Sequence, residues 1–147
     1  MSIQDSPKLT YEELYQTGMD NFNSVVITTI GFLKKHQISI HEYVTYVGER
    51  FAKNWPPNLT ACDLANEMAK HFMSVGANIE ELVGDEDESH FVMTGWLPAD
   101  VLLRYSGNEA ETDLFIRVSQ PIAEHQNCSF EMERQDDRVI CKFRRKS

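Results

Sequence analysis

The sequence lacks the segments that would place it in or across a membrane. No apolar run approaches the ~20 residues that a membrane-spanning helix needs. The opening residues, MSIQDSPKL, contain no hydrophobic core of a secretory signal. The three cysteines are odd in number and form no C-x-x-C pair. We therefore expect a cytoplasmic protein with reduced thiols and no membrane partner.

The common motifs of metal and nucleotide chemistry are missing too. The sequence has no H-E-x-x-H, no G-x-G-x-x-G, no phosphate loop and no G-x-S-x-G. No two of its five histidines are spaced as zinc ligands on one helix. These absences argue against the usual nucleotide and hydrolase mechanisms, and we expect neither a metal nor a cofactor.

Positive charge is scarce, because 14 Lys and Arg residues stand against 23 Asp and Glu, a net charge of −9. Such a chain is not expected to bind nucleic acid or an anionic membrane. The 147 residues are 41% hydrophobic, which is enough for one domain with a core. No repeat or low-complexity linker divides them. We expect a flexible tail at residues 1–9 and a single domain at residues 10–147.

A C-terminal β-hairpin is the clearest element in the sequence. Residues 128–146, CSFEMERQDDRVICKFRRK, alternate polar and apolar on both sides of Asp136-Asp137. A two-residue turn at these aspartates fixes the register and separates Cys128 from Cys141 by ~13 Å, too far for a disulfide. The predicted opposite pairs are Phe130 with Phe143, Met132 with Cys141, Glu131 with Lys142, and Cys128 with Arg145.

Two capping boxes, Thr10 with Glu13 and Ser39 with Glu42, predict where the first two helices begin. Thr60 and Asp63 start a third helix. The first helix runs to about Lys35, either unbroken or divided near residues 21–24, where Asn23-Ser24 could cap a second helix. The second helix ends before Trp55-Pro56-Pro57. The third ends at Gly76, which suits a left-handed cap.

The second half of the chain predicts shorter elements around the hairpin. A short helix passes through Ile79 and Leu82, and an acidic stretch at residues 80–88 ends in a loop. The segment 90–96, HFVMTGW, is apolar on both faces and predicts a central strand with the hairpin beside it. A helix follows at residues 99–105. Residues 109–123 fit a further helix, or a short strand at Leu114, Ile116 and Val118.

Helices followed by strands predict an α+β fold. We expect N-terminal helices packed on a small antiparallel sheet that ends in the C-terminal β-hairpin. An edge strand of that sheet could pair with a second copy of the chain.

Three residues are candidates for catalysis: Cys62, His71 and Cys141. Cys62 lies in the first turn of its helix, where the helix dipole can favour a thiolate. His71 or His41 could serve as the base. His71 shares a helix face with Asp63 and Glu67, a row that could also hold a metal or relay a proton. Buried structural thiols and a solvated helix face are the alternative interpretations.

Aromatic residues make up 10% of the chain and combine apolar area with polar tips. If several of them line one cavity, it would suit a small, partly apolar ligand. The candidate ligand-binding residues are Tyr43, Tyr46, Trp55, Trp96 and Tyr105.

Charge is unevenly distributed along the second half of the chain. Residues 138–146 contain five basic residues and no acid, whereas residues 80–88 are acidic. The basic end is either a solvated strand edge or a docking surface for an acidic partner or for the chain's own acidic stretch.

The ending Cys141-Lys142-Phe143-Arg144 resembles the C-x-F-R ending of the L-2-amino-thiazoline-4-carboxylate hydrolase-like family. That family also places helices before a small sheet. The Gly-Asp pair expected before the family's cysteine is absent here, where Asp136-Asp137-Arg138 precedes Val139. The resemblance implies that Cys141 lies near a ligand site.

The sequence thus predicts a non-enzymatic domain that binds a small ligand or a protein and forms a homodimer. Two alternatives remain. One is a small-molecule hydrolase with a cysteine nucleophile. The other is a regulatory adaptor that docks other chains through its acidic loop and basic C-terminus.

Overall fold

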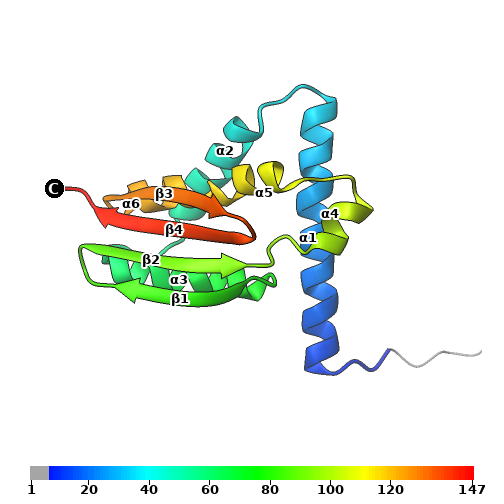
Figure 1. The fold of residues 1–147 in the computed structure, drawn as a ribbon, viewed down its shortest axis with the longest axis horizontal. Helices are drawn as coiled ribbons and strands as arrows, with labels where there is room; N and C mark the ends of the chain where they lie inside the picture. Colours follow the sequence, from blue (N-terminus) through cyan, green and yellow to red (C-terminus); the bar gives the residue numbers. More distant parts are fainter. Residues whose placement is uncertain (1–6) are drawn as a thin grey trace, which may run out of the picture.

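The computed structural model describes residues 7–147 and confirms the predicted α+β class. Three helices come first, followed by a hairpin, three short helices and a second hairpin (Figure 1). The elements are α1 (Tyr11–Lys35), α2 (Ile40–Ala52), α3 (Ala61–Ser74), β1 (Asn78–Gly84), β2 (Glu88–Thr94), α4 (Ala99–Arg104), α5 (Glu109–Ile116), α6 (Ser119–His125), β3 (Cys128–Gln135) and β4 (Arg138–Arg145).

The four strands form one antiparallel sheet in the order β1-β2-β4-β3. The prediction that β2 is central, with the C-terminal hairpin beside it, is therefore confirmed. The hairpin register is confirmed too, since Phe130 lies opposite Phe143, Met132 opposite Cys141, Glu131 opposite Lys142, and Cys128 opposite Arg145. Asp136 supplies the positive φ of 56° in the turn, a backbone angle that Asp tolerates better than most residues.

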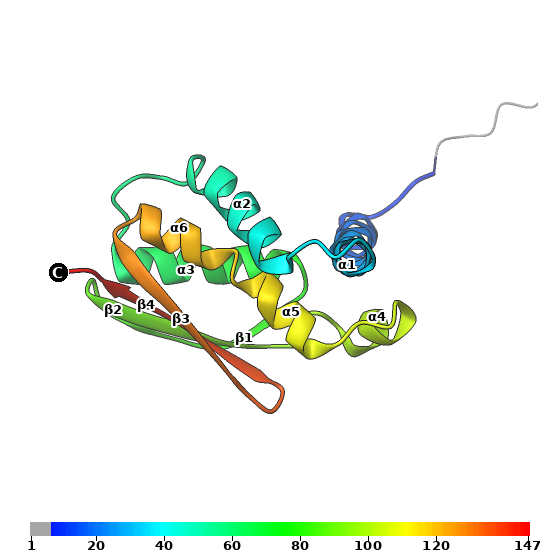
Figure 2. The same ribbon diagram turned by 90° about the horizontal axis from the view of Figure 1, so that it is seen from above.

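Helices cover one face of the sheet (Figure 2). α3 packs on β1, β2 and β4, α6 packs on β3, and α2 lies on α6. Alternate strand residues point into this layer, and their side chains are at most 2% exposed: Phe91, Met93, Val139, Cys141 and Phe143. The core therefore lies between the sheet and α3 with α6.

α2 approaches α6 closely because Gly48 has no side chain. A Cβ at this position would lie 2.6 Å from the carbonyl oxygen of Val118 and 2.9 Å from the ring of Pro121. Any larger residue would push α2 away from α6, and with it the chain that leaves the end of α2.

α1 is one unbroken helix that stands at the end of the sheet, roughly across the strand direction (Figure 1). Thr10 and Glu13 form the predicted capping box, with hydrogen bonds in both directions. The alternative of a break at residues 21–24 is wrong, and Asn23 caps no helix. It is instead fully buried in the middle of α1.

The buried amide of Asn23 joins three elements. Its Oδ1 accepts a hydrogen bond from the indole Nε1 of Trp96 at 3.1 Å. Its Nδ2 donates to the carbonyl oxygen of Val75, the C-cap of α3, at 3.0 Å. Trp96 follows β2, so Asn23 ties α1 both to α3 and to the end of the central strand.

Two further predictions about helix ends need revision. Thr60 and Asp63 form a complete capping box, but at Ser39 the side chain accepts from the backbone of Glu42 without a return bond. The span 109–123 is neither one helix nor a strand. It forms α5 and α6, which are separated by Arg117 and Val118, and Pro121 sits in the first turn of α6.

The predicted helix through Ile79 and Leu82 is wrong, because these residues belong to β1. A bulge between Ile79 and Glu81 shifts the register by one residue. Ile79 then lies opposite Met93 and Leu82 opposite Phe91, so both face the same side of the sheet. The bulge thus gives a strand the three-residue apolar spacing of a helix.

The predicted tail at residues 1–9 lies mainly outside the described residues, and residues 7–9 precede α1 without regular structure. Of the helices in the described part of the chain, none has both the length and the apolar character to cross a membrane.

We predict that Asn23→Ala lowers the free energy of unfolding by about 2–4 kcal/mol. The buried indole N–H of Trp96 would lose its partner at about 1–3 kcal/mol, and the part-buried carbonyl of Val75 would lose its partner at about 1 kcal/mol. Urea denaturation measures this change. The control is Asn21→Ala, an exposed position on the same helix that we expect to shift stability by less than about 0.5 kcal/mol. Equal effects of the two substitutions would contradict the role of Asn23.

Candidate functional site

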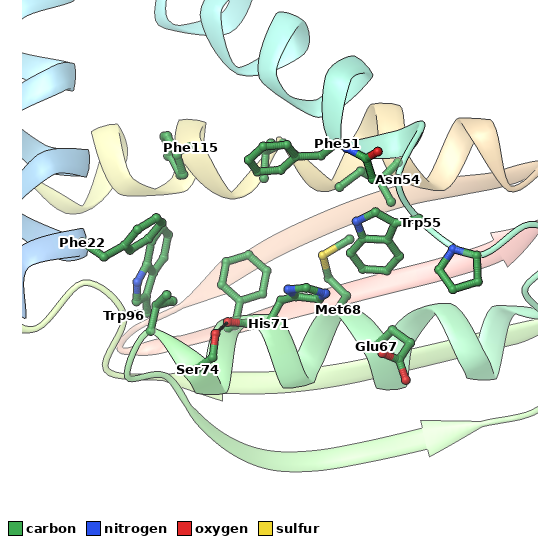
Figure 3. Close-up of a pocket in the computed structure, with 15 residues that line it drawn as sticks. Phe22, Phe51, Asn54, Trp55, Glu67, Met68, His71, Ser74, Trp96 and Phe115 are labelled. Carbon is green, nitrogen blue, oxygen red and sulfur yellow. Dashed lines mark hydrogen bonds between the residues drawn. The ribbon is translucent and has the colours of Figure 1, made fainter. Parts of the chain in front are cut away.

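An aromatic pocket of about 490 Å³ lies between α1, α3 and the chain that leaves α2 (Figure 3). It is lined from five regions that are distant in sequence: α1, the end of α2 with the following loop, α3, the segment after β2, and α5 with α6. The lining residues are Phe22, Phe51, Asn54, Trp55, Pro56, Glu67, Met68, His71, Phe72, Ser74, Val75, Trp96, Phe115, Val118 and Ile122.

The floor of the pocket is apolar and buried. Met68 and Phe72 come from one face of α3, Ile122 from α6, and Trp96 from the segment after β2. The rim is more exposed, with Phe22 from α1 and Phe51 from α2 showing 45% and 54% of their surface. A ligand in the pocket would therefore meet fixed side chains below and exposed rings at the mouth.

The rings of the pocket form two groups. At one end Trp96 packs against Phe72 with an edge contact at 5.3 Å and lies 5.9 Å from Phe115. At the other end the indole of Trp55 lies 4.9 Å from the imidazole of His71, tilted by 31° (Figure 3). Such offset and edge-on contacts are the favourable geometries for aromatic rings.

Hydrogen bonds from Gln126 hold the loop that carries Trp55. The buried Gln126 side chain donates from Nε2 to the carbonyl of Pro56 at 2.7 Å and accepts at Oε1 from the N–H of Leu59 at 2.9 Å. The loop is therefore fastened to the end of α6. No short-range pattern in the sequence pointed to Gln126, because its partners are 67 and 70 residues away.

The polar lining consists of Asn54, Glu67, His71 and Ser74. The carboxylate of Glu67 pairs with Lys70 at 2.7 Å, and the hydroxyl of Ser74 donates to the carbonyl of His71. Among the described lining residues none is Lys or Arg. The pocket can thus supply hydrogen bonds and a carboxylate, but no permanent positive charge.

Two of the five predicted ligand-binding residues, Trp55 and Trp96, lie in this pocket. The other three are not among its lining residues. Tyr46 borders a separate polar groove between α2 and α6, and Tyr105 follows α4. The sequence did not single out Phe22, Phe51, Phe72 or Phe115 as ligand-binding residues. Phe22, Phe51 and Phe72 do recur with other apolar residues at helical spacing, a pattern that predicts a buried helix face but no ligand site.

The candidate catalytic residues are not brought together. Cys62 and His71 are nine positions apart on α3, which is two and a half turns, so they face opposite sides and lie about 13 Å apart along the axis. Cys141 is fully buried beneath the helices, and desolvation, with a smaller effect from Asp113, raises the pKa of its thiol well above the usual range. Burial also raises the pKa of Cys128.

The row of Asp63, Glu67 and His71 does share one side of α3, but its members have other partners. Asp63 belongs to the capping box with Thr60, Glu67 pairs with Lys70, and His71 stacks on Trp55. Within residues 7–147, no three His, Cys, Asp or Glu side chains are grouped so that they could hold a metal ion.

The basic C-terminal strand meets the acidic stretch of the same chain. Arg144 pairs with Glu88 at 3.0 Å, and Arg138 pairs with Glu80 at 3.0 Å. The hydrogen bond and charge of Arg144 lower the pKa of the Glu88 carboxyl, and Glu88 raises the pKa of Arg144 in return. These exposed ion pairs connect β4 with β1 and β2, so the basic strand finds its partners in the acidic stretch of its own chain.

No known protein-family model matches the chain, and no curated protein matches it either. The resemblance of the Cys141–Arg144 ending to the L-2-amino-thiazoline-4-carboxylate hydrolase-like family therefore stays a prediction. A function for the pocket has to be inferred from its own geometry and chemistry.

We predict that N-ethylmaleimide modifies Cys62 in the folded protein, whereas Cys128 and Cys141 react only after unfolding in guanidinium. Both strand thiols are buried, and burial keeps them protonated and unreactive. Mass spectrometry of the labelled peptides measures the difference, and Cys62→Ser should abolish labelling of the folded protein. Rapid native labelling of Cys141 would contradict its structural role and support a nucleophilic one.

Proposed function

We propose that this protein is a binding domain for a small, planar, largely apolar molecule that is neutral or positively charged. The observation that carries this proposal is the aromatic pocket between α1 and α3, with its apolar floor and its lack of Lys and Arg. Its volume of about 490 Å³ falls in the range of about 300–1,000 Å³ that is usual for small-molecule sites.

The arrangement of the rings favours a flat ligand. The Trp96 group and the Trp55–His71 pair stand at opposite ends of the pocket, with Phe51 at the mouth between them (Figure 3). A planar molecule can stack on these faces and edges while its apolar area covers Met68 and Ile122. Contacts of this kind are worth about 0.5–1.5 kcal/mol for each aromatic pair beyond the area buried.

The charge of the lining restricts the ligand further. An anion in this pocket would lose its water and find no permanent cation, which is costly. A cation would find the faces of several rings, which attract positive charge, and it would share the carboxylate of Glu67 with Lys70. A neutral ligand with one donor or acceptor could use Asn54 or His71.

A homodimer in the cytoplasm is part of the same proposal. The three free cysteines support a reducing compartment. Hydrolysis by a cysteine nucleophile remains the alternative, but the distance between Cys62 and His71 and the burial of Cys141 give it little support. For an adaptor, the pairing of Arg138 and Arg144 with acids of the same chain leaves fewer charges for another protein.

Three naphthalene probes that share a ring and differ in charge would test the proposal by isothermal titration calorimetry. We predict that naphthalen-2-ylmethanol and naphthalen-2-ylmethylammonium bind, and that 2-naphthoate binds at least about tenfold more weakly, or 1.4 kcal/mol. Tighter binding of naphthoate would refute the charge argument, and no binding of any probe would refute the aromatic site.

A pair of variants on α2 locates the binding. Phe51→Ala removes a ring at the rim of the pocket. It should lower the affinity for the neutral probe, naphthalen-2-ylmethanol, by about 3–10-fold, which corresponds to the loss of one aromatic contact. Tyr46→Ala removes a similarly exposed ring of the same helix that does not line the pocket, and it should leave the affinity unchanged.

A further inference from the structure

α1 carries an apolar stripe that its own domain leaves mostly exposed. The residues Tyr11, Tyr15, Gly18, Phe22, Val25, Thr29 and Phe32 recur at alternating intervals of four and three positions, and we call this stripe the α1 seam. Tyr11 is 92% exposed, Val25 61% and Phe32 58%. A strict four–three repeat of this kind is the pattern of a two-stranded coiled coil.

The seam is distinct from the side of α1 that packs on the domain. The body-facing residues are Asn23, Val26, Ile27, Ile30 and Leu33, all of them buried. At 100° per residue, the two stripes are offset by about a third of a turn. α1 stands at the edge of the molecule in both views (Figures 1 and 2), and the seam side chains are mostly exposed. Phe22, at the rim of the pocket, and Tyr15, whose hydroxyl donates to the carbonyl of Met73, lie where the seam borders the body.

We propose that the α1 seams of two copies of this chain pack against each other in antiparallel orientation. The direction follows from the charges at the helix ends. The first turn of α1 carries Glu12 and Glu13, and its last turn carries Lys34 and Lys35. Antiparallel packing sets the acidic end of each helix beside the basic end of the other, and it also opposes the two helix dipoles. Parallel packing would instead set ends of the same charge beside each other.

The seam also fixes a register. Two antiparallel alignments pair three seam positions with three others, those in which the paired numbers add up to 40 or to 47. Only the sum of 47 also sets Glu12 opposite Lys35 and Glu13 opposite Lys34, so the charges select it. Tyr15 then meets Phe32 of the second copy, Gly18 meets Thr29, and Phe22 meets Val25. Tyr15 and Phe32 pair at the ends of the seam, and Phe22 and Val25 pair at its centre. The small pair of Gly18 and Thr29 lies between them, where a Cβ on Gly18 would have open space around it.

A second copy is the occupant that this geometry favours. The seam and the charged ends are complementary to themselves when the helix is turned end for end, which is the requirement of a twofold interface. On the flank of such a pair, Leu14 of one copy lies beside Lys35 of the other, and both are exposed in the single chain.

Analytical ultracentrifugation tests the pairing. We expect a mass of twice 17.0 kDa for the full chain. Val25→Glu and Phe32→Glu should each reduce the mass to that of one chain, whereas Thr17→Glu, which is exposed on α1 but outside the seam, should keep the dimer. Circular dichroism melts would verify that each variant is folded. A single-chain mass at high concentration, or a dimer that survives both seam substitutions, would overturn the proposal.

Disulfide trapping tests the direction separately. In a Cys62→Ser background, the double variant Leu14→Cys/Lys35→Cys should form covalent dimers on mild oxidation. Neither single variant should, because in this register the two copies of position 14 lie about 29 Å apart along the axis, and the two copies of position 35 about 35 Å. Tyr11→Cys alone would cross-link only in a parallel pair, where the two Tyr11 positions meet. If Tyr11→Cys forms covalent dimers and the double variant does not, the antiparallel arrangement is overturned.

Discussion

The two hydrogen bonds of Asn23 hold together the parts of the molecule that form the pocket. A buried amide must satisfy its donor and its acceptor, and here the partners come from the C-cap of α3 and from the indole of Trp96. The position of α1 and the orientation of the Trp96 ring are therefore set together. Trp96 packs on Phe72 and Phe115 at the floor of the pocket. The arrangement of these rings therefore depends on the side chain of Asn23 in α1, which holds the Trp96 indole.

The opposite end of the pocket is fixed by a similar device. Gln126 bonds the loop after α2 through two backbone groups, and Gly48 lets α2 lie close to α6, so the indole of Trp55 is held over His71. The two tryptophans are thus positioned before any ligand arrives. Binding to such a site costs less ordering of side chains than binding to a flexible one, which favours affinity for a small molecule.

The sequence predicts those elements whose signals are local. The C-terminal hairpin follows from alternation over a few residues and a two-residue turn, and the Thr10 and Thr60 caps follow from partners three positions apart. β1 is misread because its bulge puts Ile79 and Leu82 on one face. Of the pocket, the sequence predicts only Trp55 and Trp96. It does not predict the roles of Asn23 and Gln126, because their hydrogen-bond partners lie 52 to 73 residues away. No local pattern encodes such partners.

α1 combines the two proposals in one element. Its body-facing stripe contains Asn23, and its seam contains Phe22, which also lines the rim of the pocket. If the seam pairs with a second copy, the ring of Phe22 lies between the pocket and the partner helix, and its freedom to turn outward is reduced. A ligand that needs the ring turned toward the pocket would then bind the dimer more tightly than the single chain. By thermodynamic reciprocity the same ligand would strengthen the pairing by the same factor.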